Sequence, residues 1–202
     1  MLLQIHPKNP DQRKIKQVLD CLRSGGIIIY PTDTIYGLGC SIEHPSAIER
    51  ICRIKHIQPD KALLSFICGD LSLFSDYTIS IDTPKYRFFK QYTPGAFTFI
   101  LPSSKKSPKI LRTKKDTVGI RVPDNQICRT LLHELGHPIL STSLPYTEDE
   151  IPYTDPEIME EVFGSQVDIV IDGGMGNITA STIVDCTKEP IEIIRQGEGI
   201  ID

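Results

Sequence analysis

The stretch at residues 27–39 reads IIIYPTDTIYGLG and carries both the fold prediction and the strongest candidate ligand site. Its first four residues are β-branched or aromatic, which is typical of a buried strand. Pro31 then ends strand pairing, and Thr32, Asp33 and Thr34 place two hydroxyls and a carboxylate directly after it. Ligands of open α/β sheets bind at such strand ends. The stretch therefore predicts a site for a small polar ligand, with a hydrogen-bonded structural turn as the alternative.

Helical and strand patterns alternate on both sides of this stretch. Asn9 can cap a first helix, Pro10 suits its first position, and apolar residues recur at helical spacing until Gly25. Further helices are predicted at 47–55, 84–91, 126–135 and 155–163. Strands are predicted at 27–30, 63–68, 97–101, 118–122, 138–142, 167–171, 182–185 and 191–195. The alternation indicates an α/β fold, and the two successive C-terminal strands indicate a mixed sheet.

The composition is that of an ordinary globular protein, with 40% hydrophobic and 24% charged residues. We expect a single domain over residues 1–202, because no linker or repeat interrupts the chain. No apolar run approaches the roughly 18 residues that cross a membrane. Without a secretory signal at the start, the protein is expected in the cytoplasm, with its six cysteines as reduced thiols.

The charge distribution offers one candidate binding segment. The formal net charge of −4 argues against wholesale coating of nucleic acid. Residues 105–115, however, carry six lysines and arginines without an acidic residue. Such a run forms either a solvated loop or a surface that faces phosphate.

Two further motifs are weaker candidates for a functional site. Residues 133–137 read HELGH, which matches the zinc motif H-E-x-x-H. Gly136 and Pro138 favour a helix end inside the motif, so we expect no zinc hydrolase and assign no metal site. Residues 172–177 read DGGMGN and lack the spacing of a nucleotide-binding loop, so they predict a tight turn.

Other strand ends carry arginines and hydroxyls. Arg121 lies inside the apolar strand sequence VGIRVP, where an unpaired guanidinium is costly. It either pairs with a carboxylate of the protein or awaits an anionic group of a ligand. Hydroxyls at 141–143 and at Ser181, together with Arg195, stand at further strand ends. This combination favours a carboxylate or phosphate ligand.

These segments, in this order, resemble the YrdC/YciO family, and most closely its YciO branch. The matching pieces are PTDTIYGLG (31–39), Lys55, YTPGAFTFIL (92–101), TVGIRVP (117–123), STS (141–143), STIVD (181–185) and IIRQGEG (193–199). The resemblance implies a twisted open mixed sheet with flanking helices and a large concave cleft. It also implies a nucleotidyltransferase, an L-threonylcarbamoyladenylate synthase that uses L-threonine, bicarbonate and ATP with Mg²⁺. The product of such synthases serves tRNA modification, and double-stranded RNA binding is also attributed to the family.

The resemblance further implies roles for individual residues. The threonine side comprises Thr34, Arg121, Ser143 and Ser181, with Arg121 clamping the carboxylate. The nucleotide side comprises Lys55, Lys61, Thr117 and Arg195. Lys55 and Arg121 are the candidate catalytic residues.

The chain departs from the synthase pattern on the nucleotide side. The synthases' K-x-R falls on Lys55–Ile57, their S-x-N falls on Ser143–Pro145, and a histidine of theirs falls on Phe66. Lys61 stands where they have an asparagine and supplies a charge of its own. The departures leave three hypotheses: a synthase, a nucleotide- or RNA-binding protein without full synthase activity, and an enzyme that breaks down the adenylate or acts on another small carboxylate.

Overall fold

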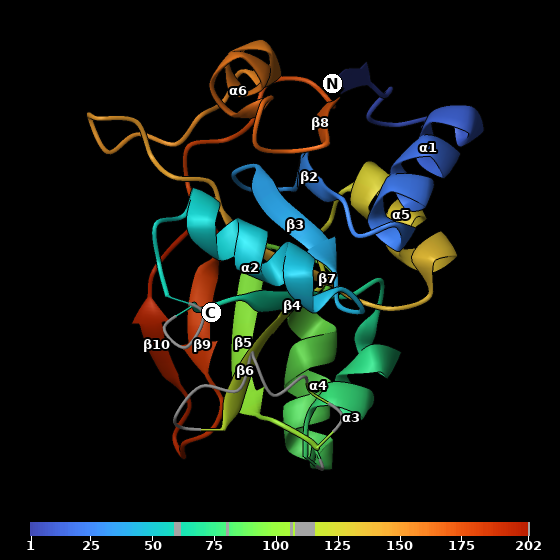
Figure 1. Cartoon of the computed structure of the whole chain (residues 1–202). Coiled ribbons are helices and arrows are strands. Elements are labelled where there is room, and N and C mark those ends of the chain that lie inside the picture. The colour runs from blue at the N-terminus through green and yellow to red at the C-terminus, as the bar shows by residue number, and fades with distance from the viewer. Residues whose placement is uncertain (59–61, 80, 106, 108–115, 202) are drawn as a thin grey trace.

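A computed structural model describes residues 1–58, 62–79, 81–105, 107 and 116–201. These residues form one mixed sheet of ten strands, in the order β1-β8-β2-β3-β7-β4-β6-β5-β9-β10, with helices packed against it (Figure 1). The strands are β1 (Leu2–Gln4), β2 (Ile27–Tyr30), β3 (Gly37–Ser41), β4 (Ser65–Ile67), β5 (Phe97–Pro102), β6 (Thr117–Arg121), β7 (Ile139–Ser143), β8 (Ile169–Asp172), β9 (Thr182–Asp185) and β10 (Glu192–Arg195). The prediction of an α/β fold with a mixed sheet is confirmed.

Most helices lie between strands in the sequence, as the alternating pattern predicts. They are α1 (Gln12–Arg23), α2 (Pro45–Ile54), the 3₁₀ turn η2 (Leu71–Leu73), α3 (Phe74–Tyr77), α4 (Thr83–Tyr92), α5 (Gln126–Leu135) and α6 (Pro156–Phe163). Among the described residues, no helix is both long and apolar enough to span a bilayer.

The sheet separates two hydrophobic clusters, and β2 shows how. All four of its residues are buried. Ile27 and Ile29 join the cluster that includes α2 and α4, whereas Ile28 and Tyr30 join the cluster beneath α1 and α5. Successive side chains of a strand point to opposite faces, so an unbroken apolar run is what a strand covered on both faces requires. Figure 1 shows α1 and α5 packed side by side.

The first helix begins later than its sequence pattern predicts. Asp11, and not Asn9, is the N-cap, and its carboxylate accepts hydrogen bonds from the backbone N–H groups of Arg13 and Lys14. The backbone N–H of Asn9 instead donates to Nδ1 of His6 at 3.1 Å, which holds Asn9 in the preceding turn. A carboxylate is a good cap because it also meets the positive end of the helix dipole.

Two strands were absent from the prediction, and the second one shapes the site. β3 follows the loop that carries Thr32, Asp33 and Thr34, which we call the TDT loop. It pairs antiparallel with β2, with Tyr30 opposite Gly37 and Ile28 opposite Gly39. A Cβ on Gly37 would lie 2.9 Å from the Tyr30 ring, and one on Gly39 would lie 2.7 Å from Cγ2 of Ile139. Close approach of neighbouring groups, not a special backbone angle, therefore requires these glycines.

The H-E-x-x-H motif does not form a zinc site. Gly136 adopts a left-handed conformation (φ 79°) and ends α5 after Leu135, so the two histidines do not share one helix. His137 instead lies with its Nε2 3.6 Å from a carboxylate oxygen of Glu43. All six cysteines are free thiols, as expected, and only Cys21 is not fully buried.

Candidate functional site

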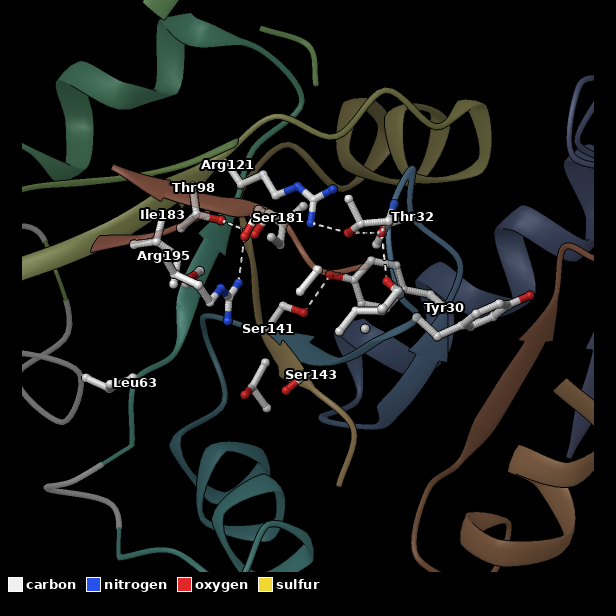
Figure 2. A pocket seen from close by; sticks show the side chains of 18 of the residues that line it. Tyr30, Thr32, Leu63, Thr98, Arg121, Ser141, Ser143, Ser181, Ile183 and Arg195 are labelled. Atoms are coloured by element: carbon white, nitrogen blue, oxygen red, sulfur yellow. Dashed lines mark hydrogen bonds between the residues drawn. The ribbon is translucent and has the colours of Figure 1, made fainter. Parts of the chain in front are cut away.

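A cleft of about 240 Å³ opens where the β2–β3 loop meets the ends of β4, β6, β7 and β9 (Figure 2). The hairpin β2–β3 supplies one side, because its loop carries Thr32 and Thr34 over the sheet. The strand pairings β3·β7, β7·β4 and β4·β6 bring the other segments beside it. Residues far apart in sequence thus meet at one place, as the strand-end argument predicts.

Arg121 is the charged group at the centre of this cleft. It is only 6% exposed, at the end of β6. One guanidinium nitrogen, Nη1, donates to Oγ1 of Thr34 at 2.9 Å, and Nη2 forms an ion pair with the carboxylate of Asp33. Its Nε is buried and has no hydrogen-bond partner among the described residues. The first sequence-based alternative is therefore met, because Arg121 pairs with a carboxylate of the protein, and the role toward a ligand stays a prediction.

The TDT loop holds its own shape. Oγ1 of Thr32 donates to the carbonyl oxygen of Ile35 at 2.8 Å and accepts from the backbone N–H of Thr34 at 3.0 Å. Threonine hydroxyls that bond to nearby backbone groups stabilise such turns. The loop therefore presents the Thr34 hydroxyl to Arg121 from a fixed backbone.

A second group of hydroxyls lies next to Arg121. Oγ1 of Thr98 and Oγ of Ser181 are 2.9 Å apart, and Nη2 of Arg195 donates to the carbonyl oxygen of Ser181 at 2.7 Å. Both hydroxyl residues are buried. Thr98 was not predicted as a site residue, although a threonine on the inward face of an apolar strand is a signal that could have identified it. We call Thr32, Thr34, Thr98, Arg121 and Ser181 the polar wall.

The side of the cleft near β7 is anchored by buried polar groups. The Tyr30 hydroxyl donates to Oγ of Ser141 at 2.7 Å, and burial raises the pKa of Tyr30. Nζ of Lys55 lies 3.4 Å from Oγ of Ser143 and donates to the carbonyl oxygen of Leu144 at 3.1 Å. Desolvation lowers the pKa of Lys55. Lys55 thus contacts a residue of the cleft from α2's C-terminal end.

The remaining edge of the cleft is apolar. Leu63 is 78% exposed and Tyr146 is 45% exposed, and both line the cleft. We call these two residues the apolar margin. In Figure 2, Leu63 lies well apart from Arg121, Thr98 and Ser181.

Three described positions that depart from the synthase pattern, Ile57, Phe66 and Pro145, do not line the cleft. Ile57 packs against the hydrophobic core. Phe66 is also buried, with its ring 5.0 Å from that of Tyr77, while its neighbours Ser65 and Ile67 line the cleft. Because side chains alternate along a strand, position 66 faces away from the cleft. A side chain introduced at position 66 would reach a ligand in the cleft only if the register of β4 changed.

Two predicted nucleotide-side residues are not brought to the cleft by the described structure. Thr117 lies at the start of β6, opposite Pro102, and does not line the cleft. Lys61 lies outside the described residues, as do all the cations of the run at 105–115 except Lys105. Their assigned roles stay predictions.

The glycine-rich turn at 172–177 braces the site from behind. The Tyr36 hydroxyl donates to the carbonyl oxygen of Gly174 at 2.6 Å and accepts from the backbone N–H of Gly173 at 3.2 Å. Nδ2 of Asn177 donates to the carbonyl oxygen of Asp33 at 3.1 Å. The turn predicted from sequence is therefore a structural support of the TDT loop.

The residues of the cleft do not form a metal site of their own. Across the described part of the chain, no group of three or more His, Cys, Asp or Glu is placed to hold an ion. Asp33, a carboxylate next to the polar wall, is already paired with Arg121.

The chain is similar to proteins of one family along most of its length. Residues 20–197 match the sequence profile of the Sua5/YciO/YrdC family, described as "Telomere recombination". The uncharacterized protein YciO of Escherichia coli K12 is 43% identical over 96% of this chain and 94% of its own. A threonylcarbamoyl-AMP synthase of Pseudoalteromonas translucida is 31% identical over 87% of this chain and 94% of its own.

Solved structures agree with the sequence matches. The crystal structure of E. coli YciO superposes with a TM-score of 0.93 and 42% identity, covering 99% of this chain and 97% of that one. P. abyssi Sua5, complexed with L-threonine, superposes with a TM-score of 0.88 and 26% identity, covering 98% of this chain and 57% of that one. With its sheet, its cleft and its sequence matched in this way, the chain belongs to the Sua5/YciO/YrdC family.

Proposed function

We propose that this protein binds L-threonine in its cleft and joins it to bicarbonate and ATP, as an L-threonylcarbamoyladenylate synthase. The observation that carries the proposal is the polar wall. It places a buried arginine with an unpartnered Nε beside three threonine hydroxyls and one serine hydroxyl. A guanidinium suits a carboxylate, and short hydroxyls suit the polar side chain of threonine.

Relatives support the choice of threonine over other small carboxylates. A family member with the same fold, P. abyssi Sua5, is complexed with L-threonine. Synthases at about the same distance in sequence carry the activity in their names. The residues assigned to threonine, Thr34, Arg121 and Ser181, line one cleft here, with Ser143 at its β7 side.

The reaction needs little covalent help from the protein. The threonine amine takes up the carbon of bicarbonate, and the resulting carbamate oxygen attacks the α-phosphorus of ATP, releasing pyrophosphate and, overall, one water. The protein's contribution is to hold the reactants together and to offset negative charge on the phosphates. Arg121 would fix the threonine carboxylate, and Lys55 and Arg195 would face the nucleotide. Mg²⁺ would arrive with the phosphates of ATP.

A pyrophosphate-release assay tests the proposal. Purified protein is supplied with ATP, Mg²⁺, bicarbonate and L-threonine, and each component is omitted in turn. We expect pyrophosphate only with all of them present, together with a product of the mass of threonylcarbamoyladenylate. Release at the background rate from folded protein would refute synthase activity.

A second function is favoured by the altered nucleotide side. Ile57, at the position of the synthases' arginine, packs into the core, and Pro145 replaces an asparagine. A protein that binds nucleotide or double-stranded RNA in the same cleft without full synthesis fits these changes. RNA affinity should then fall steeply with salt and drop when Lys105 and Lys106 are changed to Glu. No binding at low salt would remove this candidate.

A further inference from the structure

The carboxylate of Asp33 pairs with the guanidinium of Arg121 at the edge of the cleft's polar wall. Arg121 lines the cleft, whereas Asp33 is not among the lining residues. The two form a largely buried ion pair, with the Asp33 side chain 14% exposed. We infer that Asp33 is a positioning residue that sets Arg121 for a ligand carboxylate, an inference that rests on the proposed threonine-binding function.

Asp33 and Thr34 engage donors on two different nitrogens of Arg121. A guanidinium has five N–H groups, and two contacts from adjacent residues hold it: Asp33 at Nη2 and Thr34 at Nη1. Two contacts on different nitrogens fix the plane of the group as well as its position. The two contacts use one N–H of Nη1 and one of Nη2, so three N–H groups are left for a ligand, and that of Nε belongs to a buried nitrogen without any partner among the described residues.

Asp33 is held in turn by the glycine-rich turn at 172–177. Its carbonyl oxygen accepts from Nδ2 of Asn177 at 3.1 Å, and the backbone N–H of Asn177 points to the carbonyl oxygen of Thr34 at 3.4 Å. The turn that carries Asn177 is itself tied to the Tyr36 hydroxyl. The Asp33 carboxylate is thus attached to a braced loop, which a positioning role requires.

Two roles of Asp33 predict opposite results. As a mere counter-charge, Asp33 offsets the positive charge of Arg121 and weakens its attraction for an anion, so its removal should strengthen threonine binding. As a positioning residue, its removal frees the guanidinium and should weaken threonine binding. The sign of the change therefore decides between them.

Calorimetric titration of L-threonine into Asp33 variants is the first test. We expect Asp33→Asn, which keeps an acceptor of the same length, to bind within a few-fold of wild type. We expect Asp33→Ala to bind about tenfold more weakly or worse, with ATP affinity unchanged. Asp124→Ala, which removes a 64%-exposed carboxylate paired at 3.9 Å with Arg129, is the matched control and should bind as wild type does. Equal or tighter binding by Asp33→Ala overturns the inference.

A charge-retaining variant provides a second test, which does not depend on the folding of Asp33→Ala. Asp33→Glu keeps the negative charge and moves it by one methylene. A positioning role predicts weaker threonine binding, whereas a counter-charge role predicts no change. Wild-type affinity in Asp33→Glu therefore contradicts the inference even where the alanine variant does not fold.

Proton NMR of the Arg121 Nε–H separates this inference from the proposed function. The signal is identified by its loss in Arg121→Lys. We expect it to be sharp and slowly exchanging in wild type and Asp33→Asn without any ligand, and broadened or rapidly exchanging in Asp33→Ala. The same signal in all three proteins refutes positioning by Asp33. An ordered signal without threonine binding would instead refute the proposed ligand.

Discussion

The two sides of the cleft are built on different principles. On the polar wall, Arg121, Thr34 and Ser181 are buried, and each takes part in a hydrogen bond. On the apolar margin, Leu63 and Tyr146 are exposed, and neither is tied to the polar wall by a hydrogen bond among those described. A buried polar network is costly unless it is satisfied, so the hydrogen bonds of the polar wall hold its side chains in a defined arrangement. The exposed side chains of the apolar margin are not held in this way.

Removal of the guanidinium should have the largest effect. Arg121→Met leaves the Asp33 carboxylate buried without its partner, so we expect a loss of about 3–5 kcal/mol in the free energy of unfolding. Threonine binding should fall below detection in calorimetry. Urea unfolding measures the stability term. Arg129→Met, which removes a 51%-exposed arginine, should change neither quantity. Wild-type threonine affinity in Arg121→Met would disprove the assigned role of the polar wall.

The β2–β3 hairpin, whose loop carries Thr32 and Thr34 of the polar wall, should tolerate no side chain at Gly37. A Cβ there would lie 2.9 Å from the Tyr30 ring and 3.0 Å from Oγ of Ser141. We expect Gly37→Ala to cost about 1–3 kcal/mol in the free energy of unfolding and to weaken threonine binding.

Gly69→Ala provides the control for that variant. Its Cβ would meet nothing closer than Cβ of Leu132 at 3.4 Å, an ordinary contact. Urea unfolding measures the loss of stability in both variants. Equal losses would show that the close contact between position 37 and Tyr30 is not the reason for a glycine there.

Variants of the apolar margin should leave threonine binding unchanged. Leu63→Ala and Tyr146→Ala remove exposed side chains that make no hydrogen bond to the polar wall, so threonine affinity should stay within about twofold of wild type. Any effect should fall on ATP affinity, measured in the same calorimeter. A tenfold loss of threonine affinity in either variant would erase the distinction between the two sides.

The smallest expected effect is on the pH dependence of the free energy of unfolding, to which Lys55 contributes. Burial lowers its pKa from the usual 10.5, so between the lowered value and 10.5 the unfolded chain binds more protons than the folded protein. Its contribution to the free energy of unfolding therefore rises with pH in that window. Lys55→Met should flatten this rise in urea unfolding as the pH increases toward 10.5. Parallel curves for the two proteins would show that Lys55 is not desolvated.

The sequence predicted the fold class correctly but missed β1 and β3, whereas the roles assigned to the site residues stay predictions. Arg121 was identifiable because a charged residue interrupts an apolar strand only at a cost, and Thr34 and Ser181 were named because their hydroxyls stand at strand ends and match the family motifs. β3 was missed because its GLG sequence has a low strand propensity, and the close approach of Ile139, 100 residues further along the chain, is part of what requires Gly39. The pairing of Asp33 with Arg121, 88 residues apart, likewise depends on strand order.

The N-cap of α1 shows a second limit of prediction from the sequence. Asn9 and Asp11 are both good caps, and local sequence could not choose between them. The His6 ring accepts a hydrogen bond from the backbone N–H of Asn9, which keeps Asn9 in the preceding turn and leaves Asp11 as the N-cap. The nucleotide side is the least predictable region, because Lys61 and most of the basic run fall outside the described residues.

Titration of L-threonine into the wild-type protein and into Arg121→Lys tests the central claim most directly. If the polar wall is a threonine site, wild type should give saturable heat with L-threonine and none with D-threonine. Arg121→Lys, which keeps the charge but loses the planar fork, should bind at least tenfold more weakly. Absence of heat from folded wild-type protein, or equal affinity in Arg121→Lys, would contradict the account.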